Sequence, residues 1–184
     1  MEDRAIISLL FARAEQALTE LAKKFGSGLH RLAKNITGSE EDAQECVNDT
    51  YLALWNAIPP ACPDPLSAYA YRTGRNIALK RHRGNTAAKR GNSYDLSLDE
   101  LAGCVADYTA SESLDARLLG DAISRFLAEE SKENRILFLR RYWFGDSVRD
   151  AAKAVALNEN AASVRLSRLR NKLKDFLIRE GYYL

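Results

Sequence analysis

The chain has 184 residues, of which 46% are hydrophobic and 28% are charged, and this composition suits one folded domain or two small ones. The formal net charge is only +2, so any affinity for nucleic acid must come from charge that is segregated along the chain. The three cysteines and two histidines form no metal-ligand or disulfide pattern, and no apolar run reaches the length of a membrane span. These features exclude a zinc site, a disulfide scaffold and membrane insertion, and they fit a cytoplasmic protein.

The first 38 residues have apolar positions at helical spacing. The pattern covers residues 4–25 and resumes over residues 29–36. Gly26 and Gly28 are expected to break the helix between these two stretches. Gly38 stands where a helix C-cap glycine is common.

A further helix is predicted from Ser39, whose hydroxyl can cap it, to Pro59 and Pro60, which end it. Its expected buried stripe consists of Ala43, Cys46, Val47, Thr50, Leu54 and Trp55. Four residues fall away from that stripe, namely Glu45, Asn48, Asp49 and Leu52. The exposed side of this helix is therefore expected to be acidic.

The loop IPPACPDP holds all four prolines of the chain and is expected to keep one shape. The helix that follows, over about residues 66–83, has Tyr69 and Tyr71 near its start and Arg72 and Arg75 further along. Aromatic rings interleaved with arginine suit unstacked bases, because rings stack on the bases and cations hold the phosphates. Tyrosines on a helix also commonly pack in a core, and that alternative stays open.

Residues 84–113 begin basic and become acidic and weakly apolar. This composition predicts a linker that is mostly extended or mobile in the free protein. Leu96, Leu98 and Leu101 also allow a short helix or a contact with a partner.

Helices resume near Leu114, and a helix-turn-helix pattern follows over residues 147–174. Ser147 and Asn158 are the expected N-caps of its two helices. The second helix has an apolar stripe of Ala162, Leu166, Leu169, Leu173 and Phe176, and no acidic residue lies between Asn160 and Lys174. The pattern indicates a helix that can enter a DNA major groove. An amphipathic helix with a solvated basic face is the alternative.

No stretch has the alternation of a strand, so the predicted fold class is all-α. Two helical lobes joined by a flexible linker are expected, with boundaries at residues 1–90, 91–113 and 114–184.

Two stretches resemble a known family. The run ITGSEEDAQECVNDTYLALWNAI followed by AYRTGRNIALKRHR is similar to region 2 of the sigma-70 family. The C-terminal run LFLRRYWFGDSVRDAAKAVALNENAASVRLSRLRNKLK is similar to region 4. With only these two regions and a short linker, the chain resembles the extracytoplasmic-function (ECF) group of sigma factors.

This resemblance implies a factor that binds core RNA polymerase and directs it to promoter DNA, both duplex and single-stranded. The implied polymerase-binding residues are Glu45, Asn48, Asp49 and Leu52. The implied contacts to the melted −10 element are Ala61, Cys62, Asp64, Leu66, Tyr69, Arg72, Arg75, Asn76 and Lys80. The implied contacts to the −35 element are Arg149, Asn160, Ala161, Ser163, Val164, Arg165, Ser167, Arg168 and Lys172, and Arg170 is expected to touch phosphate. Many members of the group are held by an anti-sigma factor, so the resemblance also implies a partner of that kind, although no residue here identifies one.

The acidic linker has two open interpretations. In the family the linker threads toward the cationic RNA exit channel of the polymerase, which would suit its carboxylates. An acidic spacer that only keeps the chain in solution is the alternative.

The second lobe departs from the family pattern at three places. Ala151 replaces a larger residue at a core position, and Ser163 replaces a lysine that would touch DNA. Ala156 stands where the turn commonly has glycine, and a positive φ there would cost alanine about 1 kcal/mol. The lobe is therefore expected to bind DNA weakly without the polymerase.

No arrangement of residues indicates catalysis, so the chain is expected to be neither an enzyme nor dependent on a cofactor. A helix-turn-helix repressor or activator that binds duplex DNA without polymerase is one alternative. A helical adaptor without DNA affinity is another. The acidic face and the aromatic–arginine helix of the first lobe favour a sigma factor over both.

Overall fold

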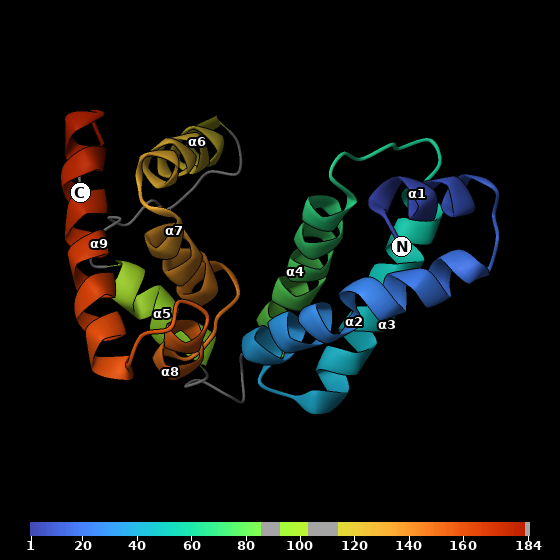
Figure 1. The fold of residues 1–184 in the computed structure, drawn as a ribbon, viewed down its shortest axis with the longest axis horizontal. Helices are drawn as coiled ribbons and strands as arrows, with labels where there is room; N and C mark the ends of the chain where they lie inside the picture. Colours follow the sequence, from blue (N-terminus) through green and yellow to red (C-terminus); the bar gives the residue numbers. More distant parts are fainter. Residues whose placement is uncertain (86–92, 103–113, 183–184) are drawn as a thin grey trace. The chain divides into compact units, whose positions relative to one another are not determined.

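The computed structural model describes residues 1–85, 93–102 and 114–182, and every regular element in those ranges is a helix. The chain divides into two units, Met1–Asn92 and Ser93–Leu184 (Figure 1). Each unit has its own hydrophobic core. The predicted all-α class is therefore confirmed.

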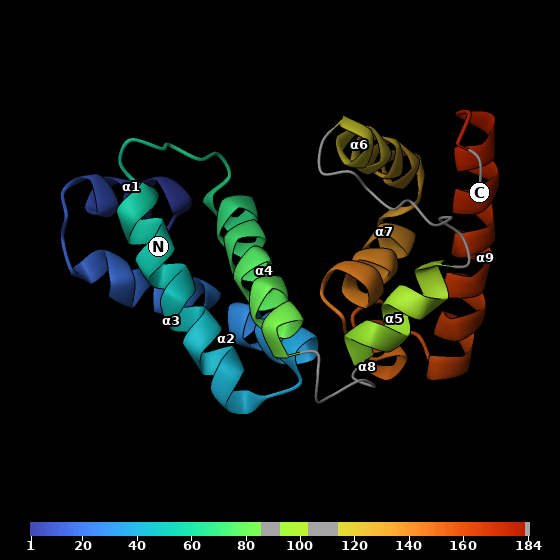
Figure 2. The same cartoon turned by 180° about the vertical axis from the view of Figure 1, so that it is seen from behind.

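The first unit consists of α1 (Asp3–Phe11), α2 (Gln16–Thr37), α3 (Glu40–Ala57) and α4 (Leu66–Asn85). Each of α2, α3 and α4 packs against the other two, and α1 packs on α2 and α4 (Figure 2). Their shared core includes Leu21, Phe25, Leu29, Leu54 and Leu66. Buried apolar residues recur along the whole length of α2, as the helical period of the sequence predicts.

Local chemistry fixes the boundary between α2 and α3. Gly38 ends α2 in the left-handed conformation with φ 71°. The Ser39 hydroxyl oxygen accepts a hydrogen bond of 3.3 Å from the Asp42 backbone N–H, which caps α3. Both capping predictions are confirmed.

The predicted helix break at Gly26 and Gly28 is wrong, because α2 runs through both residues. The chain instead turns between α1 and α2, where Arg13 has φ 54°. A Cβ on Gly28 would lie 2.0 Å from the Tyr71 hydroxyl oxygen, and a Cβ on Gly26 would lie 3.0 Å from that of Tyr51. The two glycines therefore make room for tyrosines of α3 and α4 and do not interrupt the helix.

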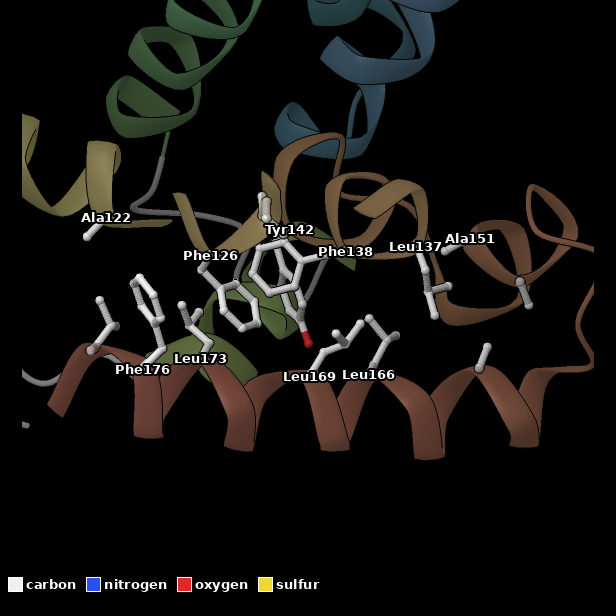
Figure 3. Close-up of a cluster of buried hydrophobic side chains, with 14 residues drawn as sticks. Ala122, Phe126, Leu137, Phe138, Tyr142, Ala151, Leu166, Leu169, Leu173 and Phe176 are labelled. Carbon is white, nitrogen blue, oxygen red and sulfur yellow. The ribbon is translucent and has the colours of Figure 1, made fainter. Parts of the chain in front are cut away.

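The second unit consists of α5 (Ser93–Ala102), α6 (Leu114–Glu129), α7 (Lys132–Phe138), a π-helical turn η1 (Leu139–Trp143), α8 (Val148–Lys153) and α9 (Glu159–Arg179). Helix α9 packs against α6, α7 and α8. Figure 3 shows Leu166, Leu169, Leu173 and Phe176 of α9 directed toward the aromatic side chains of Phe126, Phe138 and Tyr142. The apolar stripe predicted for this helix is thus its buried side.

Residues 93–102 form α5 and pack on η1, so the expected extended linker is wrong for them, while the short helix that Leu96, Leu98 and Leu101 allowed is confirmed. Tyr94 and Ser97 are buried there, and Leu101 packs at the edge of the second core. Helix α5 belongs to the second unit because a carboxylate on it meets buried arginine, as described below. The rest of the expected linker, residues 86–92 and 103–113, lies outside the described residues.

Within the described ranges, no helix is both long and apolar enough to cross a membrane.

Candidate nucleic-acid interface

The four residues predicted to bind a protein partner share the exposed side of α3. Glu45, Asn48, Asp49 and Leu52 are all exposed, and Leu52 retains 59% of its surface. They are exposed because Ala43, Cys46, Val47, Thr50 and Leu54 take the buried side of the same helix. The face is acidic with one apolar side chain at its end, as the sequence predicts.

This acidic face already holds a cation from the same chain. Arg81, near the end of α4, lies with Nη1 at 2.6 Å from Glu45 Oε2 and 3.5 Å from Asp42 Oδ1. Its Nη2 lies 3.7 Å from Asp49 Oδ2. The hydrogen bond to Glu45 is the main cause of a raised pKa for the Arg81 guanidinium. Sequence reasoning missed Arg81 because nothing in the spacing of the basic block shows which of its cations faces α3.

Helix α4 carries several of the cations predicted to bind a single strand. Arg72, Asn76 and Lys80 are exposed, and Arg75 is half-buried. These positions recur every three or four residues, so they lie along one side of the helix, while Leu66, Ala70 and Ala78 are buried. The helix thus offers a row of donors to a polyanion.

The aromatic residues of α4 are more buried than a base-stacking role requires. Tyr69 and Tyr71 are half-buried and pack against the core of the first unit. The Tyr71 ring meets Phe25 edge to face, with centroids 6.1 Å apart. The alternative that these tyrosines are core and rim residues therefore fits both, although neither is fully buried.

The proline-rich loop before α4 has both exposed and buried members. Cys62 and Asp64 are exposed, and Ala61 packs against the core. Leu66 is fully buried, and its side chain anchors the start of α4 in the core. The prediction that this side chain contacts the melted strand is therefore corrected. Asp3 of α1 accepts a hydrogen bond from the Ser67 backbone N–H at 3.3 Å, which fixes the same point.

The helix-turn-helix forms from α8 and α9 as predicted. Ser147 caps α8 by accepting from the Asp150 N–H at 3.1 Å, and Asn158 caps α9 by accepting from the Ala161 N–H at 2.8 Å. Ala156, in the turn, has φ 53°, the left-handed conformation that favours glycine. The anticipated strain at this alanine is therefore present.

The exposed side of α9 carries most of the residues predicted to read a duplex. The exposed members are Asn160, Ala161, Ser163, Val164, Ser167, Arg168 and Lys172, and Arg165 is half-buried. Arg149 of α8 is also exposed, and its Nε lies 3.4 Å from Glu159 Oε2 at the start of α9. Backbone geometry and side-chain exposure together present this row to solvent along one helix.

Among the cations of α9 expected to contact DNA, Lys172 and Arg170 have partners within the chain. Lys172 lies 3.0 Å from Glu130, beside an open hollow of about 540 Å³ that Arg165 and Arg168 also line. Arg170 donates to the Tyr142 hydroxyl at 2.7 Å and to Glu100 at 3.3 Å. The expectation that Arg170 contacts phosphate is therefore corrected, because its guanidinium binds Glu100 of α5 and Tyr142 of η1.

Glu100 is the second functional residue that sequence reasoning missed. Its carboxylate accepts hydrogen bonds from Arg141, Tyr142 and Arg170. Burial raises the pKa of Tyr142 to about 12. The sequence shows Glu100 only as an acidic residue in a weakly apolar stretch, and this pattern does not reveal its partners Arg141, Tyr142 and Arg170.

Nothing in the part of the chain that the structure describes forms a cluster of histidine, cysteine and carboxylate side chains able to hold a metal. Cys46 is buried, and burial raises the pKa of its thiol.

Comparison with known proteins gives a family match within the first unit and relatives along most of the chain. Residues 21–88, which include α3, α4 and the loop between them, match the family described as Sigma-70 region 2. The chain is 27% identical over 182 residues to the RNA polymerase sigma factor CnrH of Cupriavidus metallidurans, covering 95% of this chain and 94% of the relative. It is 29% identical over 162 residues to the ECF RNA polymerase sigma factor SigL of Mycobacterium tuberculosis, covering 84% of this chain and 86% of SigL.

A solved structure described as CnrH in complex with the cytosolic domain of CnrY is similar over 96% of this chain and 97% of that chain. Its sequence identity is 22% and the TM-score is 0.45.

Proposed function

Because this chain is a sigma factor of the sigma-70 family, in its extracytoplasmic-function group, we propose that it directs core RNA polymerase to specific promoters by contacting both the −10 and the −35 elements. Its role belongs to transcription initiation, and proteins of this family are in general not enzymes. The observation that carries the proposal is the exposed acidic face of α3, which lies inside the segment that matches Sigma-70 region 2.

We propose that this acidic face binds the polymerase. Glu45, Asp49 and Leu52 combine two carboxylates with an exposed apolar side chain, and this combination suits a cationic partner that also offers apolar contact. Asn48 lies between them and supplies both a donor and an acceptor.

We propose that α4 and the proline-rich loop take the melted −10 strand. The row of Arg72, Asn76 and Lys80 supports this role because it supplies spaced donors for phosphates. Cys62 and Asp64 of the loop are exposed and are our candidates for contacting an unstacked base. Extruding a base from the stack costs a few kcal/mol.

We propose that α9 enters the major groove of the −35 element. Asn160, Ser163 and Ser167 are short polar side chains suited to base edges, and Arg168 suits a guanine or a phosphate. The N-caps Ser147 and Asn158 support this role because they stabilise the first turns of α8 and α9, the two helices of the motif.

The strongest alternative is a helix-turn-helix regulator that acts without polymerase. The second unit alone is compatible with it. The first unit is not explained by it, because such a regulator has no use for the acidic face of α3 beside the cationic helix α4.

The deciding experiment mixes the full chain with core RNA polymerase and a promoter library and sequences the transcript starts. We expect discrete start sites that core polymerase alone does not produce. A Glu45→Lys/Asp49→Lys variant should lose these start sites while keeping its helical circular dichroism spectrum. Start sites identical to those of core polymerase alone would overturn the proposal, and DNA binding without any effect on initiation would favour the regulator.

An anti-sigma partner and a cytoplasmic location stay predictions from the resemblance.

A further inference from the structure

The acidic face of α3 and the end of α4 are joined by one residue. Arg81 reaches three carboxylates of α3, at 2.6 Å from Glu45, 3.5 Å from Asp42 and 3.7 Å from Asp49. These acids stand three and four positions apart, so they line one side of the helix. Two of them, Glu45 and Asp49, are residues that we propose for polymerase binding.

The same oxygens are accessible from solvent. The side chains of Glu45 and Asp49 retain 61% and 54% of their exposed surface, and that of Arg81 retains 32%. A cation on a partner can therefore approach both acids from outside. A cation that approaches Glu45 Oε2 competes there with the Arg81 guanidinium, which makes the shortest of these contacts.

Arg81 also sets the charge that a partner meets. Asp42, Glu45 and Asp49 carry three negative charges, and Arg81 cancels one of them. A cationic surface approaching α3 is attracted less strongly than it would be to the bare acids.

We propose that Arg81 is an internal competitor for the acidic face of α3, so that the chain binds core polymerase by exchanging its own guanidinium for a cation of the polymerase. This inference rests on the proposed function, because it takes polymerase to be the partner of that face. The free chain then holds its polymerase-binding site in a partly neutralised form. The contact lowers the affinity for any cationic protein that lacks the remaining complementary contacts.

The test is an Arg81→Gln variant of the full chain, measured by its affinity for core RNA polymerase. Glutamine removes the charge and keeps a polar side chain of similar reach. We expect about two- to fivefold tighter binding, the range that an exposed ion pair can supply. The gain should shrink as salt is added, because both surfaces are exposed.

Two further variants separate competition from a structural role. In a Glu45→Gln/Asp49→Asn background, Arg81→Gln should give a smaller gain in polymerase affinity than in wild type, because Asp42 is then the only one of the three acids left for Arg81 to shield. Arg81→Lys keeps the charge without the planar fork and should bind between wild type and Arg81→Gln. Lys23→Gln is the charge-matched control, because Lys23 pairs with Glu20 on α2 and should leave the affinity unchanged.

The outcomes distinguish this inference from the function on which it rests. If wild type does not bind core polymerase, the proposed function fails. If wild type binds and Arg81→Gln binds equally or more weakly, only the competitor inference is overturned. An equal gain in Lys23→Gln would also overturn it, since the gain would then reflect net charge alone.

Discussion

Glu100 of α5 is the counterion of Arg141, a buried arginine of η1. The guanidinium donates to both carboxylate oxygens, at 2.6 Å from Nη2 and 3.3 Å from Nε, while its Nη1 donates to the Asp146 carbonyl at 2.9 Å. The Arg141 side chain is only 4% exposed, and that of Glu100 is 32% exposed. A charge at this depth needs a partner, and α5 supplies it from the segment expected to be a linker.

Replacing Glu100 with Gln should therefore destabilise the second unit by about 1–3 kcal/mol, because Arg141 loses its charged acceptor. Denaturant unfolding in a Trp55→Phe background, where Trp143 is the only tryptophan, would measure the free energy of unfolding of this unit. Glu129→Gln is the matched control, since Glu129 is exposed on α6 and should change the free energy little. Equal effects of the two variants would contradict the assigned role of Glu100.

Tyr142 should make the stability of the second unit depend on alkaline pH. Its folded pKa is about 12 because of burial, against an ordinary value of 10.0. The folded state thus keeps a proton that the unfolded state loses, so the contribution is complete below about pH 10 and disappears as the pH rises through about 12. The unfolding free energy of wild type relative to Tyr142→Phe should fall by about 2–3 kcal/mol over this range. A constant difference would mean that Tyr142 titrates normally.

Ala156→Gly should stabilise the helix-turn-helix, by up to about 1 kcal/mol, because glycine adopts the positive φ of this turn without strain. Ala154→Gly is the control, because Ala154 has φ −66° and gains nothing from glycine. The two variants should shift the unfolding free energy in opposite directions. A loss of stability at position 156 would show that the turn does not strain alanine.

Gly28→Ala should destabilise the first unit by about 1–3 kcal/mol, because its Cβ would lie 2.0 Å from the Tyr71 hydroxyl. Adding Tyr71→Phe removes that oxygen and should recover part of the loss in the double variant. Gly84→Ala provides the comparison, since a Cβ on Gly84 meets nothing within 4 Å, and it should be neutral or mildly stabilising. Thermal unfolding of the four proteins would measure these effects.

Arg168→Ala should weaken binding of the polymerase complex to promoters with a matched −35 element by about 1–3 kcal/mol if Arg168 reads a base. Arg179→Ala removes the same charge from the far end of α9 and should have less effect. Titration of promoter variants by the complete complex would measure both. An equal loss on every DNA sequence would assign Arg168 to the phosphate backbone.

The sequence by itself determined the features that depend on neighbours along the chain. The helical period placed Leu166, Leu169 and Leu173 on the buried side of α9, and capping chemistry located Ser39, Ser147 and Asn158. The same period left Glu45 and Asp49 on the exposed side of α3. These results follow because a helix repeats at a known interval and its first N–H groups need acceptors.

Only the tertiary structure decided which distant side chains meet. Gly28 resembles a helix breaker until Tyr71, 43 positions later, occupies the space beside it. In the sequence, Glu100 is one acid of an expected linker, and only packing brings it against Arg141, 41 positions later. Arg81 is likewise one cation among several, and only the packing of α4 on α3 places it at the acidic face. Periodicity and composition describe each helix alone, whereas the charge and space at a contact belong to two helices at once.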